Sequence, residues 1–142
     1  MKVHPYLNFD GTAEKAFDFY QGVFGGEIKG SMKMLEAPDG DKLPEEEQNR
    51  IMHIALPIGE DVYLMASDII PSMGHKLQRG NQTYVLLAPE NKEEADRLFK
   101  GLSEGGEIEM QIQEMFWGDY FGSFVDKFGI RWMINCEKGD GC

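Results

Sequence analysis

The sequence predicts an α+β fold made of two βαβββ modules, each forming a curled mixed sheet. The main observation is an internal repeat. Gly25-Gly26-Glu27-Ile28 returns as Gly105-Gly106-Glu107-Ile108, an offset of 105 − 25 = 80 residues. The strand-like segments that begin at Tyr6 and Tyr84 are offset by 84 − 6 = 78 residues. In both halves a strand-like stretch and a helical stretch come before the tetrapeptide, which indicates two copies of one supersecondary unit.

Residues 12–24 are expected to form the helix of the first module. Thr12 can cap its amino end, and Gly25 can end it in the left-handed conformation that glycine tolerates. Its apolar residues recur three and four positions apart, which is the spacing of a buried helix face. They are Ala13, Ala16, Phe17, Tyr20, Val23 and Phe24.

Residues 92–103 are expected to form the matching helix of the second module. Asn91 can cap this helix, and Glu94 follows three residues later as in a capping box. Gly105 and Gly106 end it. Its buried stripe is Ala95, Leu98, Phe99 and Leu102.

The remaining elements are strands, because their side chains alternate or flank short turns. They are residues 6–9, 27–34, 50–58 and 61–66 in the first module, and 84–87, 107–114, 121–126 and 130–136 in the second. Residues 37–48 are acidic, contain two prolines and are expected to be a loop. We expect one fused domain, with a module at about 1–68, a linker at about 69–82 and a module at about 83–137.

Composition and charge exclude several classes of partner. The chain has 142 residues, and 14 basic against 25 acidic side chains give a net charge of −11. This balance disfavours nucleic acid and anionic membrane surfaces, which attract lysine and arginine. No apolar run is long enough for a membrane span, and no secretory signal is visible. We therefore expect a cytoplasmic protein in which Cys136 and Cys142 are reduced thiols.

The sequence also lacks the common cofactor and nucleophile motifs. It contains no GxGxxG and no GxxxxGK[ST], so no nucleotide cofactor is indicated. No G-x-S-x-G is present, which disfavours serine hydrolysis.

The repeat and its motifs resemble the vicinal oxygen chelate superfamily, which includes glyoxalase I, extradiol dioxygenases and the bleomycin-resistance proteins. The closer resemblance is to the PhnB-like branch and covers nearly the whole chain. The segments that carry it are His4-Pro5-Tyr6-Leu7, Ala16-Phe17-Asp18-Phe19-Tyr20, Leu64-Met65-Ala66-Ser67-Asp68 and Phe116-Trp117-Gly118-Asp119-Tyr120-Phe121-Gly122. The resemblance implies that the modules form a cleft for a small organic ligand, without nucleic acid or membrane partners, and that the protein is a homodimer. Symmetric dimers are also the commonest oligomers.

In the metal-using members of this superfamily, four strand residues hold a divalent ion. His4 falls on the histidine position of the first strand. Leu64, Thr83 or Tyr84, and Met133 fall near the other three positions and are not ligands for such an ion. The resemblance therefore favours a ligand-binding protein without a tightly bound metal. The alternative is a metal-dependent lyase, isomerase or dioxygenase in which His4 is a ligand.

His4 and His53 are the candidate catalytic residues. Histidine can act as a metal ligand or as a general base near neutral pH. For His4 the structural alternative is a hydrogen-bonded residue at the start of a strand, and for His53 it is a satisfied residue on a half-buried strand. His75 lies in the linker and is expected to be a solvated loop residue.

An apolar, aromatic wall is expected around the ligand, because small-molecule pockets are mostly apolar with a few polar groups. Trp117 favours this wall, whereas Trp132 fits a core position as well as a pocket. The methionines suit an adaptable cavity or ordinary packing. The candidate ligand-binding residues are Tyr6, Met65, Trp117, Asp119, Phe121 and Trp132.

Overall fold

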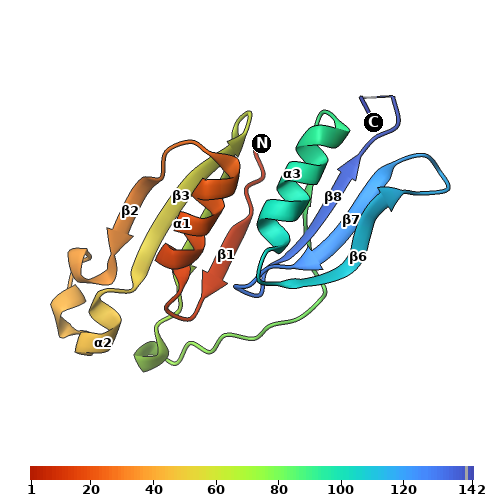
Figure 1. Cartoon of the computed structure of the whole chain (residues 1–142). Coiled ribbons are helices and arrows are strands. Elements are labelled where there is room, and N and C mark those ends of the chain that lie inside the picture. The colour runs from red at the N-terminus through yellow and green to blue at the C-terminus, as the bar shows by residue number, and fades with distance from the viewer. Residues whose placement is uncertain (140) are drawn as a thin grey trace. The chain divides into compact units, whose positions relative to one another are not determined.

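Two compact units make up the chain, Met1–Gln78 and Arg79–Cys142. The computed structural model describes residues 1–139 and 141–142. In each unit one long helix covers one face of a four-stranded mixed sheet (Figure 1). The predicted α+β class with its βαβββ order is therefore confirmed, and the unit boundary falls inside the segment 69–82. No helix of the described residues combines the length and the hydropathy needed to cross a membrane.

The sheet of the first unit has the strand order β1-β4-β3-β2. β1 pairs parallel with β4, and the other neighbours are antiparallel. Its elements are β1 (Tyr6–Phe9), α1 (Ala13–Phe24), β2 (Lys29–Lys33), β3 (Ile51–Gly59) and β4 (Val62–Asp68).

The helix α1 packs on β3 and β4 and buries one face of this sheet. The helix contributes the spaced apolar residues that the sequence indicates. The buried side chains of the sheet and helix include Phe9, Phe17, Tyr20, Ile54, Leu56, Leu64 and Ala66. Because successive strand residues point to opposite faces, Tyr6, His53 and Met65 lie on the face without a helix.

The amino end of α1 is capped by a residue far away in the sequence. Thr12 makes no side-chain cap, so the prediction for Thr12 is wrong. The buried carboxylate of Asp68 accepts instead: Oδ1 from the amides of Gly11 (2.9 Å) and Ala13 (3.1 Å), and Oδ2 from the amide of Ile51 (2.8 Å). Asp68 thus joins the end of β4 to the start of α1 and of β3.

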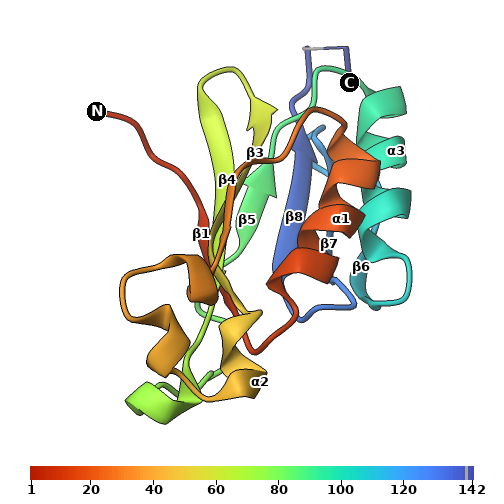
Figure 2. The same ribbon diagram turned by 90° about the vertical axis from the view of Figure 1, so that its left-hand side faces the viewer.

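Residues 37–48 are not the irregular loop expected from the sequence. They contain a 3-10 turn, η2 (Gly40–Lys42), and the short helix α2 (Glu45–Gln48), after η1 (Met34–Glu36). Glu47 is buried and accepts from the amide of Ser72 (2.8 Å) and from its hydroxyl. Ser72 lies in η3 (Pro71–Met73), which Figure 2 shows beside α2. This contact between distant segments stabilises turns that the local composition does not predict.

The sheet of the second unit repeats the arrangement, with the order β5-β8-β7-β6. Asn91 caps α3 by accepting from the amide of Glu94 at 2.8 Å, as predicted. Gly122 lies against Phe99, because a Cβ there would come within 2.7 Å of that ring. The elements are β5 (Val85–Leu87), α3 (Lys92–Ser103), β6 (Glu107–Glu114), β7 (Tyr120–Val125) and β8 (Arg131–Cys136).

The carboxyl end differs from the expectation of two reduced thiols. Cys136, fully buried at the end of β8, is paired in a disulfide with Cys142, and their Cα atoms are 5.7 Å apart. That separation lies in the usual range for a disulfide. The sequence did not indicate this pairing, because two cysteines without a scaffold pattern carry little information about geometry.

Candidate functional site

The helix-free face of the first unit brings together three of the predicted site residues. Tyr6 on β1 lies opposite Met65 on β4, and Met65 lies opposite Ala55 on β3. The hydroxyl of Tyr6 is 3.4 Å from Nδ1 of His53, and the two rings lie 5.9 Å apart at 30°. We call Tyr6, His53 and Met65 the tyrosine–histidine face. It offers an aromatic and thioether surface with one hydroxyl and one imidazole.

His4 lies just before β1, and its ring is already engaged with the chain. Its Nδ1 accepts from the backbone amide of Tyr63 at 3.0 Å, and the two rings lie 5.6 Å apart in an edge-on arrangement. An acceptor Nδ1 places the proton of a neutral imidazole on Nε2. His4 therefore has no free lone pair for a metal ion or for accepting a proton in this arrangement.

The described residues contain no gathered set of ligands for a divalent metal ion. In either unit, no three histidine, cysteine, aspartate or glutamate side chains of residues 1–139 and 141–142 gather as a ligand set. Leu64, which the sequence compares with a ligand position, is fully buried on the helix side, and its neighbour Met65 faces the open side. Neither thioether nor alkyl groups suit a hard divalent ion. Asp68, a carboxylate that could have completed a site, has both oxygens bonded to backbone amides.

The predicted residues of the second unit are spread over different surroundings. Phe121 lies on the helix-free face of β7, because its neighbour Gly122 faces α3. Trp117 lies in the turn between β6 and β7, is 49% exposed and packs edge-on against Phe116 at 4.8 Å. Phe116 is 97% exposed. Among the described residues of this unit, no ring contact joins Phe116 or Trp117 to Phe121, so the three rings do not form one wall.

Asp119 ties this turn to the end of β8. Its oxygens accept from the backbone amide of Lys138 (3.1 Å) and from the side-chain amide of Asn135 (3.2 Å). These two bonds, with a smaller contribution from Trp117, hold the pKa of Asp119 below its ordinary value. Asp119 therefore has a structural part in the turn.

Trp132 lies in the core of the second unit. It is fully buried, and its Nε1 donates to the buried carboxylate of Asp126 at 2.8 Å. The sequence allowed either a core or a pocket position for Trp132, and the structure shows the core position. Trp132 is on the helix side of β8 and does not face a ligand on the open face.

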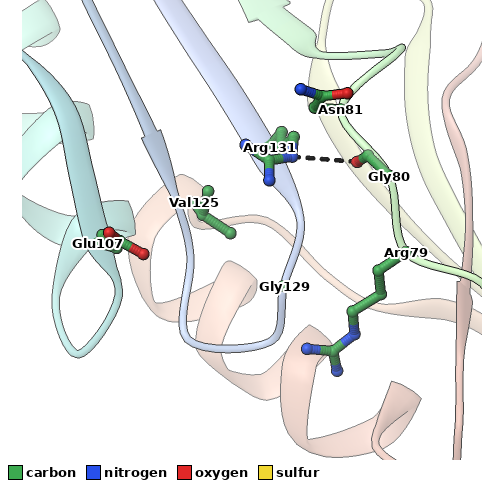
Figure 3. A pocket seen from close by; sticks show the side chains of 7 residues that line it. All are labelled: Arg79, Gly80, Asn81, Glu107, Val125, Gly129 and Arg131. Atoms are coloured by element: carbon green, nitrogen blue, oxygen red, sulfur yellow. Dashed lines mark hydrogen bonds between the residues drawn. The ribbon is translucent and has the colours of Figure 1, made fainter.

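A polar cluster on the helix-free face of the second unit was missed by the sequence reasoning. Tyr84 donates to both oxygens of Glu109 (2.9 and 3.1 Å), and Arg131 donates to Glu109 at 2.8 Å and lies over the Tyr84 ring. The repeat offset of 78 residues aligns Tyr84 with Tyr6, so this alignment could have identified Tyr84 as a candidate. Beside this cluster is a hollow of about 330 Å³ (Figure 3). It is lined by Arg79, Gly80, Asn81, Glu107, Val125, Gly129 and Arg131.

A second charged cluster lies where α3 meets β6 and β7. Tyr120 donates to Asp96 at 2.7 Å, and this bond together with burial raises the pKa of Tyr120 to about 12. Lys92 is paired with Glu114, and its hydrogen bond and charge lower the pKa of Glu114. Since each of these groups has a partner, the cluster secures the helix to the sheet edge.

Known proteins match the chain over nearly its whole length. The family model described as "Glyoxalase/Bleomycin resistance protein/Dioxygenase superfamily" matches residues 2–134. Protein YjdN of Escherichia coli (strain K12) is 34% identical over 154 aligned positions, covering 97% of each chain. The crystal structure of PA1353 from Pseudomonas aeruginosa has a TM-score of 0.84 and 35% identity, over 96% of this chain and 98% of that one. A PhnB protein from Bacillus cereus has a TM-score of 0.76 over 96% and 100% of the two chains, and its 23% identity shows the fold alone.

Proposed function

Because this chain belongs to the glyoxalase/bleomycin resistance/dioxygenase superfamily, we propose that it binds a small organic molecule on the tyrosine–histidine face, without a tightly bound metal. The observation that carries the proposal is the contact between Tyr6 and His53 beside Met65 on a sheet face that no helix of the unit covers. The proposal concerns binding and names no reaction.

The chemistry of this face suits an uncharged or aromatic ligand. Tyr6 and His53 present ring surfaces, and Met65 between them presents a polarisable thioether that adapts to different shapes. The hydroxyl and the imidazole are weakly engaged with each other at 3.4 Å, so each can exchange that contact for a ligand atom. A mostly apolar surface with a few polar groups is typical of small-molecule sites.

The bond between His4 and Tyr63 supports the metal-free form of the proposal. In the metal-dependent alternative, His4 would have to release the Tyr63 amide before offering a lone pair to an ion. Among the described residues, no group of three or more histidine, cysteine, aspartate or glutamate side chains gathers to complete such a site. We therefore assign His4 a positioning role: its bond to Tyr63 holds the start of β4 beside β1.

The experiment is a small-molecule screen on chelator-treated protein, read by thermal shift and followed by NMR titration of the hits. Tyr6→Phe and His53→Leu should weaken a hit that binds this face, the second by about tenfold for a lost hydrogen bond. His75→Leu is the matched control, because it is the same substitution at a histidine in an exposed loop, where Nδ1 accepts from the backbone amide of Ile70. Hits that need added metal, or that tolerate His53→Leu as well as His75→Leu, contradict the proposal.

The proposal also includes a homodimer in the cytoplasm. Light scattering should report twice the chain mass of 16.1 kDa, and a value near 16.1 kDa contradicts the dimer. Blocking free thiols in intact cells before lysis tests the compartment. A reducing cytoplasm should keep Cys136 and Cys142 as free thiols, so a Cys136–Cys142 disulfide found intact in the cells contradicts the cytoplasmic location.

A further inference from the structure

The hollow in the second unit has two arginines, although the chain carries a net charge of −11. We infer that this hollow binds the carboxylate of a small organic acid, with Arg79 as the main contact and Arg131 in support. The inference concerns a site in the second unit and does not depend on ligand binding at the tyrosine–histidine face.

Three segments build the hollow within this unit. Glu107, Val125 and Arg131 form one row across β6, β7 and β8, because Val125 is paired with both of the others. Opposite them, the segment from Arg79 to Asn81 runs toward β5, and the turn between β7 and β8 closes one end at Gly129 (Figure 3).

Arg79 is the guanidinium that is free to take a ligand. Within the described residues it makes no hydrogen bond or ion pair, and the hollow that it lines is open. Its guanidinium lies against the backbone of Gly129, where a Cβ would be 2.8 Å from Cζ and Nη1. Gly129 has φ of 89° and no side chain, so the guanidinium can approach this turn closely. The planar fork of donors on arginine suits a planar carboxylate.

Arg131 lines the same hollow and is held by two hydrogen bonds. Its Nε donates to the carbonyl of Gly80 at 3.0 Å, drawn as the dashed line in Figure 3, and its Nη1 donates to Glu109 at 2.8 Å. Arginine has five N–H donors, so these two bonds leave others for a ligand. The side chain of Asn81 makes no hydrogen bond with the described residues and adds an amide donor.

The charges around the hollow favour a singly charged group. Glu109 already neutralises Arg131, and Glu107 lines the hollow without an ion-pair partner among the described residues. The hollow thus has one unpaired guanidinium, that of Arg79, and one unpaired carboxylate, that of Glu107. Such a site suits a ligand with a single negative charge, because Glu107 would repel a doubly charged phosphate more strongly. Two residues beyond Arg131, Met133 lies on the same face opposite the half-exposed Leu86. The acid should therefore carry a short apolar tail.

The test is an NMR titration of isotope-labelled full-length protein with hexanoate, and with hexanamide as the neutral analogue. Saturable shifts should gather at residues 79–81, 107, 125, 129 and 131, and hexanamide should bind about tenfold more weakly. Equal binding of the two compounds, or shifts elsewhere only, overturns the inference. Signals of Tyr6 and His53 report separately on the tyrosine–histidine face.

Three variants separate this site from general charge effects. Arg79→Gln should weaken hexanoate about tenfold, whereas Arg97→Gln, the same charge change on α3, should leave it unchanged. Glu107→Gln should strengthen hexanoate about threefold by removing a repelling carboxylate, a gain that misfolding cannot produce. If Arg79→Gln and Arg97→Gln behave alike, or if Glu107→Gln weakens binding, the assignment is wrong.

Discussion

Replacing Asp68 with alanine removes one carboxylate that three backbone amides share. The amides of Ala13 and Ile51 are buried, at 3.1 and 2.8 Å from the carboxylate, and that of Gly11 is part-buried at 2.9 Å. Asp68 itself is 4% exposed, so water cannot easily replace it for the two buried amides. The substitution therefore leaves two donors unsatisfied at once.

The expected loss follows from these donors. A buried donor that loses a charged acceptor costs about 2 kcal/mol, so two of them give a loss of about 4 kcal/mol in the free energy of unfolding. Domains of this size have about 5–15 kcal/mol in total, so Asp68→Ala should be close to unfolding. Asp68→Asn keeps an acceptor for Gly11 and Ala13 but turns an amide group toward the N–H of Ile51, for a loss of about 2 kcal/mol.

Urea unfolding followed by circular dichroism measures these losses. Asp18→Asn is the matched control, because Asp18 is exposed on α1 and the charge change is the same. Its effect should stay within about 0.5 kcal/mol. If Asp68→Ala and Asp68→Asn are as stable as the control, the capping role assigned to Asp68 is refuted.

Three further predictions concern the second unit. With its pKa raised to about 12, Tyr120 should ionise well above the ordinary tyrosine pKa of about 10. The stability from its bond to Asp96 is present below a pH of about 10 and is lost as the pH rises through about 12. Asp96→Asn should make Tyr120 titrate earlier, and an alkaline absorbance titration that the variant leaves unchanged contradicts this. Trp132→Phe removes a buried 2.8 Å bond and should lower the free energy of unfolding by about 2 kcal/mol, whereas an unchanged urea midpoint would show that the bond is unimportant. The disulfide between Cys136 and Cys142 closes a short loop and should contribute about 2 kcal/mol to the free energy of unfolding. A reductant should therefore destabilise the wild type but not Cys142→Ser, and equal sensitivity of the two proteins argues against the disulfide.

The repeat and the long helices could be predicted because their signals are local. Helix spacing, glycine stops and the Asn91 cap all lie within a few residues of the elements that they define, and α1 and α3 begin within one residue of the prediction. The cap of α1 could not be predicted in this way. Its acceptor, Asp68, is 55 residues away from Ala13, and nothing near Thr12 indicates it.

The candidate site was predictable in part for a similar reason. Tyr6, His53 and Met65 were identified as candidates. Leu64, which the sequence compares with a ligand position of the superfamily, is buried on the helix side, whereas the next residue, Met65, faces the open side, because one step along a strand moves a side chain to the other face. The bond between His4 and Tyr63 depends on strand pairing, which a single sequence does not give. The hollow around Arg79 joins three separate segments, so no spacing pattern marks it.

The most direct test of the metal-free binding face is an elemental analysis by mass spectrometry. Wild-type protein and His4→Ala are purified untagged and without chelators, and zinc, nickel, manganese and iron are measured per chain. The arrangement of His4, whose Nδ1 accepts the Tyr63 amide, predicts metal far below one ion per chain in both proteins. Nearly one ion per wild-type chain that disappears in His4→Ala would contradict the account and make His4 a metal ligand.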